Sequence, residues 1–346
     1  MTDVKWVNMA LQGGGSHGAF TWGVLDRLLE DGRIGFEAIS GTSAGAMNAV
    51  VCADGLMEDG PDGARAALER FWLEMSQAAA FSPVKRTPFD VATGNWSLEN
   101  SPGYHMFDAL TRIVSPYQLN PVNLNPLRDL VARVVDFDRV QRCNATKLFI
   151  SATNVETGKV RVFETREVTA DVVMASACLP MIYQAVEIDG VPYWDGGYMG
   201  NPSLFPFHTR TDSTDIVIVQ INPIIRKGAP TTAHEIMNRI NEISFNSSLL
   251  KELRSIEFVS RLIRQGKLSG DEYRDVRVHV IQNQDELKPL GASSKMNAEW
   301  EFLVHLRDIG RETADAWLSA HADAVGREAT VNLTKIFSDI GAQPVG

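Results

Sequence analysis

The sequence predicts an α/β fold of three layers, with helices covering both faces of a mainly parallel central sheet. Short apolar runs alternate with amphipathic helical stretches over the first 60 residues, which is typical of parallel strands joined by helices. A glycine-rich turn follows each of the first two apolar runs, at residues 13–15 and 41–45. With 346 residues, 44% of them hydrophobic, the chain is long enough to bury a sizeable core.

The first strand is expected over residues 6–11, where a short apolar run stops at three glycines. Residues 16–30 follow as a helix, because their apolar side chains recur at helical spacing, and Gly32 is a plausible stop. A second strand is expected over 36–40 and a buried helix over 46–56. A further helix is expected over 64–75.

Residues 81–126 differ in character from the chain before them. Six prolines interrupt them: Pro83, Pro88, Pro102, Pro116, Pro121 and Pro126. Aromatic and other apolar side chains lie between the prolines, among them Phe81, Phe89, Trp96, Met106 and Phe107. The pattern predicts a long irregular insertion. A lid or pocket wall and a packed surface excursion are both consistent with it.

The remaining elements continue the alternation. Strands are expected over 147–153 and 160–164, a helix over 170–178, a hairpin over 186–194 that turns at Asp189–Gly190, and a strand over 216–221. Long amphipathic helices over 232–265 and 297–325 flank a strand over 276–282. We therefore predict a first domain over 1–225 and a mainly helical region over 226–346. That region either packs on the same domain or forms an interface in a homo-oligomer.

Charge and composition exclude several classes of protein. Lys and Arg number 33 against 43 Asp and Glu, a net charge of −10, which argues against general nucleic-acid binding. No apolar run is long enough for a membrane-spanning helix, and the first residues do not resemble a secretory leader. The three cysteines are widely spaced and are interpreted as reduced thiols of a cytoplasmic protein.

The turn Gly41-Thr42-Ser43-Ala44-Gly45 is a G-x-S-x-G pattern between a predicted strand and a predicted helix. A nucleophile elbow has this placement: the serine sits in a strained turn, and the small residues Gly41 and Gly45 leave room for the backbone. The helix N-terminus there favours developing negative charge. The alternative is a glycine-rich turn whose serine only caps the helix.

A second glycine turn follows the first strand and opens a helix. It comprises Gly13, Gly14, Gly15, Ser16, His17 and Gly18. Successive backbone N–H groups at a helix start form an anion site, which suits either an oxyanion hole or a pyrophosphate, since the turn also matches G-x-G-x-x-G. The second strand lacks the acidic residue at its end that a dinucleotide requires, which disfavours the latter. A tight turn without a ligand is the third interpretation.

Asp195-Gly196-Gly197 follows an apolar strand. Asp-Gly is a common turn dipeptide, so the strand before it and the second glycine after it distinguish this copy. The seven histidines form no triad pattern, and none has zinc-site spacing.

Together, the glycine turn, the G-x-S-x-G turn and the later D-G-G resemble the patatin-like phospholipase family. The likeness extends to residues 152–154 and to the ASACLP stretch at 175–180, and it spans about residues 5–225. The family's glycine turn usually has an arginine where this chain has His17. His17 would replace that arginine electrostatically only when protonated, and it is otherwise a packing residue of the loop.

The resemblance implies a serine esterase of the phospholipase A or lysophospholipase type that acts on lipid acyl esters without metal or cofactor. Ser43 would be the nucleophile, Asp195 the general base, and amides of the first glycine turn the oxyanion hole. An apolar insertion would bring peripheral contact with a membrane. Two alternatives stay open: a non-catalytic relative that binds lipid or a partner, and a dinucleotide-binding oxidoreductase that uses Gly13–Gly18.

Overall fold

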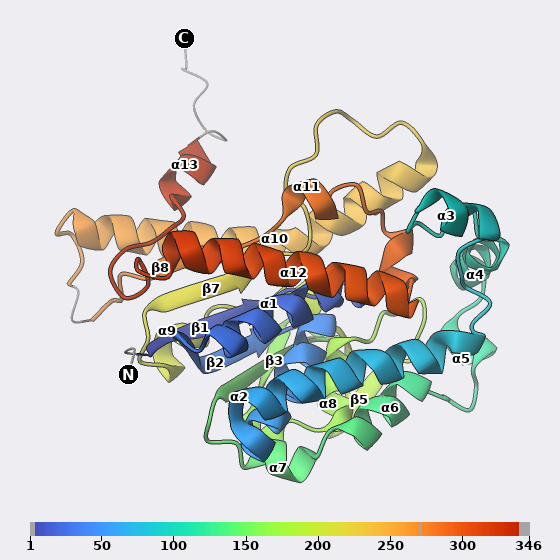
Figure 1. The fold of residues 1–346 in the computed structure, drawn as a ribbon, viewed down its shortest axis with the longest axis horizontal. Helices are drawn as coiled ribbons and strands as arrows, with labels where there is room; N and C mark the ends of the chain where they lie inside the picture. Colours follow the sequence, from blue (N-terminus) through green and yellow to red (C-terminus); the bar gives the residue numbers. More distant parts are fainter. Residues whose placement is uncertain (1–3, 270–271, 339–346) are drawn as a thin grey trace.

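The computed structural model describes residues 4–269 and 272–338, and it has the predicted three-layer architecture (Figure 1). Within this part of the chain, one sheet contains all eight strands in the order β5-β6-β3-β2-β1-β7-β8, with β4 paired to β3. The strands are β1 (Lys5–Leu11), β2 (Ile34–Gly41), β3 (Lys147–Asn154), β4 (Val160–Glu164), β5 (Val186–Ile188), β6 (Val191–Asp195), β7 (Asp215–Val219) and β8 (Arg277–Ile281).

The centre of the sheet is parallel and one side of it is antiparallel. Strands β3, β2, β1, β7 and β8 run in the same direction. Strands β4 and β6 pair antiparallel with β3, and β5 and β6 form the predicted hairpin. Asp189 and Gly190 both have positive φ at its turn, as a tight hairpin turn requires.

Helices cover both faces of this sheet. The principal ones are α1 (Gly18–Asp31), α2 (Ala44–Ala78), α6 (Pro126–Val134), α7 (Phe137–Gln141), α8 (Ala170–Ser176), α9 (Phe207–Arg210), α10 (Ala233–Arg264) and α12 (Trp300–His321). Alternate side chains of a strand point to opposite faces. Val217 and Val219 of β7 therefore join one core with α1, α2 and α12, while Ile216 and Ile218 join a second core with α9 and α10.

The predicted helices at 46–56 and 64–75 belong to a single long element with a sharp kink. The backbone leaves helical geometry at Asp59 and Gly60, and Pro61 follows. Proline removes a helix-internal hydrogen bond and clashes with the preceding turn. The two predicted helices are therefore the two arms of α2.

The segment 81–126 is helical where the sequence predicted an irregular insertion. It contains α3 (Pro88–Thr93), α4 (Pro102–Ile113) and α5 (Pro116–Leu119), and α6 begins at its end. Each of these four helices has proline among its first residues and a Thr, Ser or Asn at its N-cap. Proline has no N–H to satisfy at that position. Four of the six prolines that suggested irregularity therefore start helices, whereas Pro83 and Pro121 lie in connections between helices.

The C-terminal region takes part in the same fold as the residues before it. Strand β8 extends the sheet beside β7, and α12 packs along α1 (Figure 1). Two shorter helices, α11 (Gln284–Leu287) and α13 (Leu333–Ser338), complete the region. The α12 face that contacts α1 is thus buried within one chain. The domain boundary at 225 and an interface between copies of the chain stay predictions.

Candidate active site

Ser43 lies in a sharp turn between β2 and α2. Its backbone has φ 55° and ψ −122°. Residues other than glycine rarely adopt this conformation, which is strained. The two glycines of the motif make this turn possible. A Cβ on Gly41 would lie 2.5 Å from the Gly45 carbonyl oxygen, and one on Gly45 would collide with the Leu11 carbonyl.

A hydrogen bond from the ASACLP stretch fixes the strained residue. The Ser43 N–H donates to the hydroxyl of Ser176, the last residue of α8, at 2.9 Å. Ser176 is completely buried. Residues 175–180, which resemble the family, therefore have a local structural role: Ser176 holds the backbone of Ser43 in the strained turn.

The glycine turn after β1 lies against the elbow. A Cβ on Gly13 would lie 2.7 Å from the Ser43 Cβ atom, so only glycine allows this approach. The turn continues into the short 3-10 helix η1 (Gly15–His17). Each glycine turn follows a strand, as the sequence predicted, and the two turns meet at the carboxyl ends of the neighbouring strands β1 and β2.

The hydrogen bonds of the turn occupy some of its backbone N–H groups and not others. Gly13 N–H donates to Asn201 Oδ1 at 2.7 Å, His17 N–H donates to the Gly14 carbonyl oxygen, and Gly18 N–H is taken up within the turn. Among the described residues, no acceptor is present for the N–H groups of Gly14, Gly15 and Ser16. These three amides are the ones able to bind an anionic oxygen.

Asp195 is the last residue of β6 and pairs with Ala152 near the carboxyl end of β3. Its side chain is 1% exposed, and Oδ1 accepts the Gly197 N–H at 2.7 Å. The Asp195 N–H donates to the Cys178 carbonyl at 2.8 Å. A Cβ on Gly197 would collide with the ring of Phe245. The D-G-G sequence is thus a tight, closely packed end to the strand.

The protonation of the Asp195 carboxyl depends on its burial and on the groups around it. Burial raises the pKa of Asp195 to about 7, while the Gly197 N–H, the Ser43 hydroxyl and the Lys295 ammonium oppose that rise. The second oxygen, Oδ2, is buried and has no hydrogen-bond partner of ordinary length and angle among the described residues. The Ser43 hydroxyl thus lowers the pKa of the Asp195 carboxyl without forming a hydrogen bond of ordinary length and angle. The Oδ2 atom of Asp195 remains available to accept the proton of that hydroxyl.

Polar contacts tie the segment after Asp195 to the elbow. The Thr42 hydroxyl donates to the Gly200 carbonyl at 2.6 Å, and the Ser40 hydroxyl donates to the Ser203 carbonyl at 2.6 Å. Asn201, in the same segment, is completely buried. These bonds fix the relative positions of β2 and the end of β6, and so of Ser43 and Asp195.

His17 is a buried neutral side chain. It is 2% exposed, and its Nε2 lies 2.8 Å from the Ser294 hydroxyl oxygen. Burial, followed by the nearby Lys295, lowers the pKa of His17 to about 3. The imidazole carries no charge near neutral pH, so His17 does not replace an arginine electrostatically. The structure instead favours the interpretation of His17 as a packing residue of the loop.

Sequence reasoning missed three polar side chains of this site: Asn201, Asn222 and Lys295. Asn222 follows β7, and its Nδ2 donates to the Gly13 carbonyl at 2.7 Å. Its position just after a predicted parallel strand could have indicated that Asn222 belongs to the site, because the carboxyl ends of parallel strands lie together at one edge of a sheet. Lys295 comes from η5 (Ser293–Met296), far along the chain, and carries no motif.

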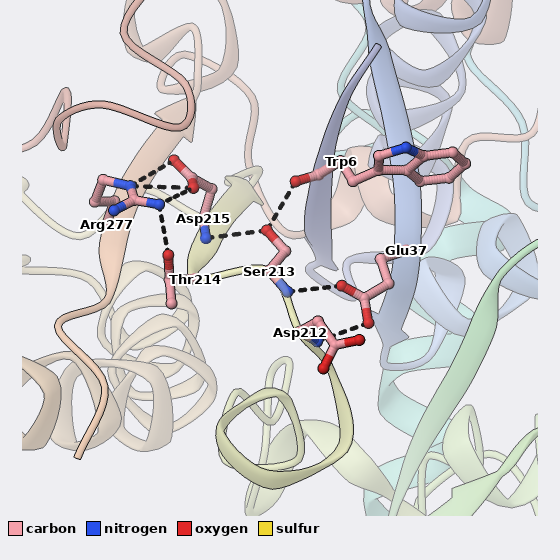
Figure 2. Close-up of a pocket in the computed structure, with 7 residues that line it drawn as sticks. All are labelled: Trp6, Glu37, Asp212, Ser213, Thr214, Asp215 and Arg277. Atoms are coloured by element: carbon pink, nitrogen blue, oxygen red, sulfur yellow. Dashed lines mark hydrogen bonds and ion pairs between the residues drawn. The ribbon is translucent and has the colours of Figure 1, made fainter. Parts of the chain in front are cut away.

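A separate cavity of about 480 Å³ lies toward the opposite end of the sheet. Figure 2 shows its lining residues, which include Trp6 and Glu37 on β1 and β2 and Arg277 at the start of β8. Glu37 accepts the N–H groups of Asp212 and Ser213 at 2.8 and 2.7 Å. The polar groups here bind one another, and the cavity does not include Ser43 or Asp195.

Comparisons with known proteins show which family the sequence matches and which solved structures have a similar fold. The family model described as patatin-like phospholipase matches residues 9–208. Among solved structures, VipD from Legionella pneumophila has a TM-score of 0.41 at 14% identity, covering 91% of this chain and 67% of VipD. ExoU of the ExoU-SpcU complex from Pseudomonas aeruginosa has a TM-score of 0.39 at 14% identity, covering 93% of this chain and 53% of the other. No curated protein matches in sequence.

In the described residues, no helix combines the length and the apolar character needed to cross a membrane. The match to the family model extends over more than half of the chain, and it contains both glycine turns and Asp195. The chain belongs to the patatin-like phospholipase family, a family of lipid hydrolases.

Proposed function

We propose that this protein hydrolyses acyl esters of lipids through an acyl-enzyme on Ser43, with Asp195 as the general base. The observation that carries the proposal is the meeting of three features. A strained serine lies against the glycine turn with its unengaged amides, and its hydroxyl interacts with a buried carboxylate. Membership of the family supports the same assignment and disfavours the dinucleotide alternative.

The reaction follows from these groups. The Ser43 oxygen attacks the ester carbonyl carbon while its proton passes to Asp195, and the carbonyl electron pair moves onto the oxygen. The amides of Gly14, Gly15 and Ser16 would bind that oxyanion. The tetrahedral intermediate expels the alcohol, which takes the proton from Asp195. Water then attacks the acyl-serine by the same route and releases the fatty acid.

The exposed surface of the insertion supports lipid as the substrate class. The insertion exposes large apolar side chains, including Phe81, Phe89, Met106, Ile113, Val122 and Leu124. Polar contacts connect the insertion to the site: Gln184 Nε2 donates to the Asn120 carbonyl at 2.7 Å, and Ser97 contacts Ser293 of η5 at 3.1 Å. Exposed apolar surface of this extent marks a site for lipid or protein.

The predicted lid residues divide into two groups. Phe81, Phe89 and Met106 are exposed and are available to acyl chains. Trp96 is instead partly buried against the core and lies beneath the Arg86 guanidinium at 4.2 Å. Trp96 therefore anchors the insertion, and the exposed residues form the lipid-facing surface in our proposal.

A substrate panel with matched serine variants tests the function. Purified wild-type protein, Ser43→Ala and the surface variant Ser255→Ala are assayed on short p-nitrophenyl esters, phosphatidylcholine and lysophosphatidylcholine. We expect hydrolysis by the wild type and by Ser255→Ala, and a loss of at least about a thousandfold in Ser43→Ala. Retained hydrolysis in Ser43→Ala would exclude the acyl-enzyme. A wild type inactive on every ester would favour the non-catalytic, lipid-binding alternative.

A further inference from the structure

The proposed reaction concentrates negative charge in a buried place, and the glycine turn brings no cation to balance it. The charge is on Asp195 at the start and on the carbonyl oxygen in the tetrahedral intermediate. His17, the basic side chain within the turn, is neutral near pH 7 because burial lowers its pKa to about 3. A positive charge must come from elsewhere in the fold if the site is to be compensated.

Lys295 lies directly beside the glycine turn. A Cβ on Gly15 would collide with the Lys295 carbonyl oxygen and would lie 3.3 Å from the Lys295 Cβ atom. The preceding residue, Ser294, holds His17 through its hydroxyl. Residues 293–296 thus pack on η1. They place Lys295 beside the glycine turn, which has no charged side chain of its own near neutral pH.

The ammonium group is linked to the turn through one side chain. Lys295 Nζ donates to Asn222 Oδ1 at 2.7 Å, and Asn222 Nδ2 donates to the Gly13 carbonyl at 2.7 Å. A Cβ on Gly14 would lie 3.7 Å from the same Asn222 Oδ1 atom. The charge therefore lies close to the amides that would bind the oxyanion.

The groups around Lys295 leave its charge available to the site. Among the charged groups around it, Glu242 acts most strongly on the ammonium by attracting it, Arg226 repels it, and Asp195 attracts it more weakly than Glu242 does. Glu242 already has two partners, since Arg226 donates to it at 2.6 Å and Arg239 at 3.1 Å. Among the described residues, no cation forms an ion pair with Asp195, and the Lys295 ammonium is the cation that lowers the pKa of its carboxyl.

We propose that Lys295 is a positioning residue that supplies the positive charge of the site, compensating Asp195 before attack and the carbonyl oxygen after it. This inference rests on the proposed ester hydrolysis. It assigns a function in the reaction to the segment 293–296, which lies outside residues 9–208 that the family model matches.

The test compares pH profiles of kcat/KM on a short p-nitrophenyl ester between pH 5 and 9.5. The proteins are wild type, Lys295→Met, Lys295→Arg and the exposed-lysine control Lys251→Met. Wild type and Ser43→Ala are measured first. If the wild type is inactive or Ser43→Ala is active, the proposed function fails. If both behave as expected, the lysine variants test this inference separately.

In Lys295→Met we expect kcat/KM at neutral pH to fall by about tenfold or more. The acidic limb should move up by about one pH unit, because an opposite charge no longer favours ionised Asp195. Burial lowers the pKa of Lys295 to about 8, so the wild type should lose activity above that pH. Lys295→Met should lack this alkaline limb, and Lys295→Arg should retain activity without it, since arginine stays charged.

Two results would overturn the inference while leaving the hydrolysis intact. One is a Lys295→Met profile that coincides with those of wild type and Lys251→Met. The other is an equal loss at every pH with both limbs unmoved, which indicates a packing role. Circular dichroism and the unfolding midpoint of each variant ensure that only folded proteins are compared.

Discussion

At the scale of residues, ionised Asp195 lowers the stability of the folded protein, yet it is the form expected to act as the general base. Burial raises the pKa of this carboxyl to about 7, so the ionised form that a general base needs is disfavoured in the folded protein. Activity should therefore rise with pH through about 7 as Asp195 loses its proton. The same buried position that excludes water limits the reaction at acidic pH.

A stability measurement tests this account of Asp195. Because the folded-state pKa lies above the unfolded value of 3.8, the folded protein binds the proton more tightly. The contribution of Asp195 to stability is therefore full below about pH 4 and declines as pH rises through about 7. Asp195→Asn removes the buried charge, so we expect a higher free energy of unfolding than wild type at pH 8.

Urea unfolding at pH 5 and pH 8 checks the direction of this effect. The advantage of Asp195→Asn over wild type should be larger at pH 8, and ester hydrolysis should be lost at both values. If Asp195→Asn is more stable than wild type by the same amount at pH 5 and pH 8, burial does not raise the pKa of Asp195 as described.

At this scale, the sequence singled out Ser43 and Asp195 as candidate site residues. Ser43 and Asp195 lie in short patterns whose glycines are explained by close backbone approaches. Lys295 could not be found in this way, because its position depends on how residues 293–296 pack on η1. Nothing in the local sequence marks that contact.

At the scale of elements, the insertion was only partly predictable. Its apolar residues and prolines were visible in the sequence, yet proline at the first positions of a helix and proline in a loop look alike without the fold. Buried Arg86 pairs with Glu299 at the start of α12, at 2.5 Å, and this ion pair fixes one end of the insertion. The exposed side of α4 is part of the surface that we propose for lipid.

A charged pair on α4 tests this surface. Met106 is 66% and Ile113 is 83% exposed, so Met106→Asp combined with Ile113→Asp leaves the core unchanged. Burial of a large apolar side chain contributes about 1.5–3 kcal/mol. We therefore expect sedimentation with phosphatidylcholine vesicles, and hydrolysis of their lipids, to fall by about tenfold or more.

The control for this pair is Ile336→Asp on α13, which adds a negative charge to another exposed apolar position. It should sediment with vesicles as wild type does. Hydrolysis of a soluble short ester should be unaffected in all variants. If the α4 pair binds vesicles as wild type does, lipid contacts the protein elsewhere.

At the scale of the whole molecule, the residues beyond 225 complete the sheet and one of its covering layers. Strand β8 pairs with β7 along five residues, and a Cβ on Gly23 of α1 would collide with the Arg307 carbonyl of α12. The alternation of strands and helices predicted the layers correctly, because this pattern determines which elements can bury their apolar faces together. It could not show which helix would cover α1.

A fragment of residues 1–225 tests whether the first domain is independent. Without α12, the apolar residues of α1 that pack on it would be exposed, and without β8 the edge of β7 would be open. We expect this fragment to aggregate or to lack a cooperative unfolding transition in circular dichroism. A fragment that unfolds cooperatively would support the predicted boundary at 225.

The account depends most on Ser43 being a nucleophile that Asp195 activates. Intact-mass spectrometry after treatment with a fluorophosphonate probe measures this directly. We expect one adduct on the wild-type protein, mapped to Ser43 by peptide sequencing, none on Ser43→Ala, and labelling slowed by about a hundredfold or more on Asp195→Asn. An adduct on another residue, or equal labelling of Ser43→Ala, would contradict the account.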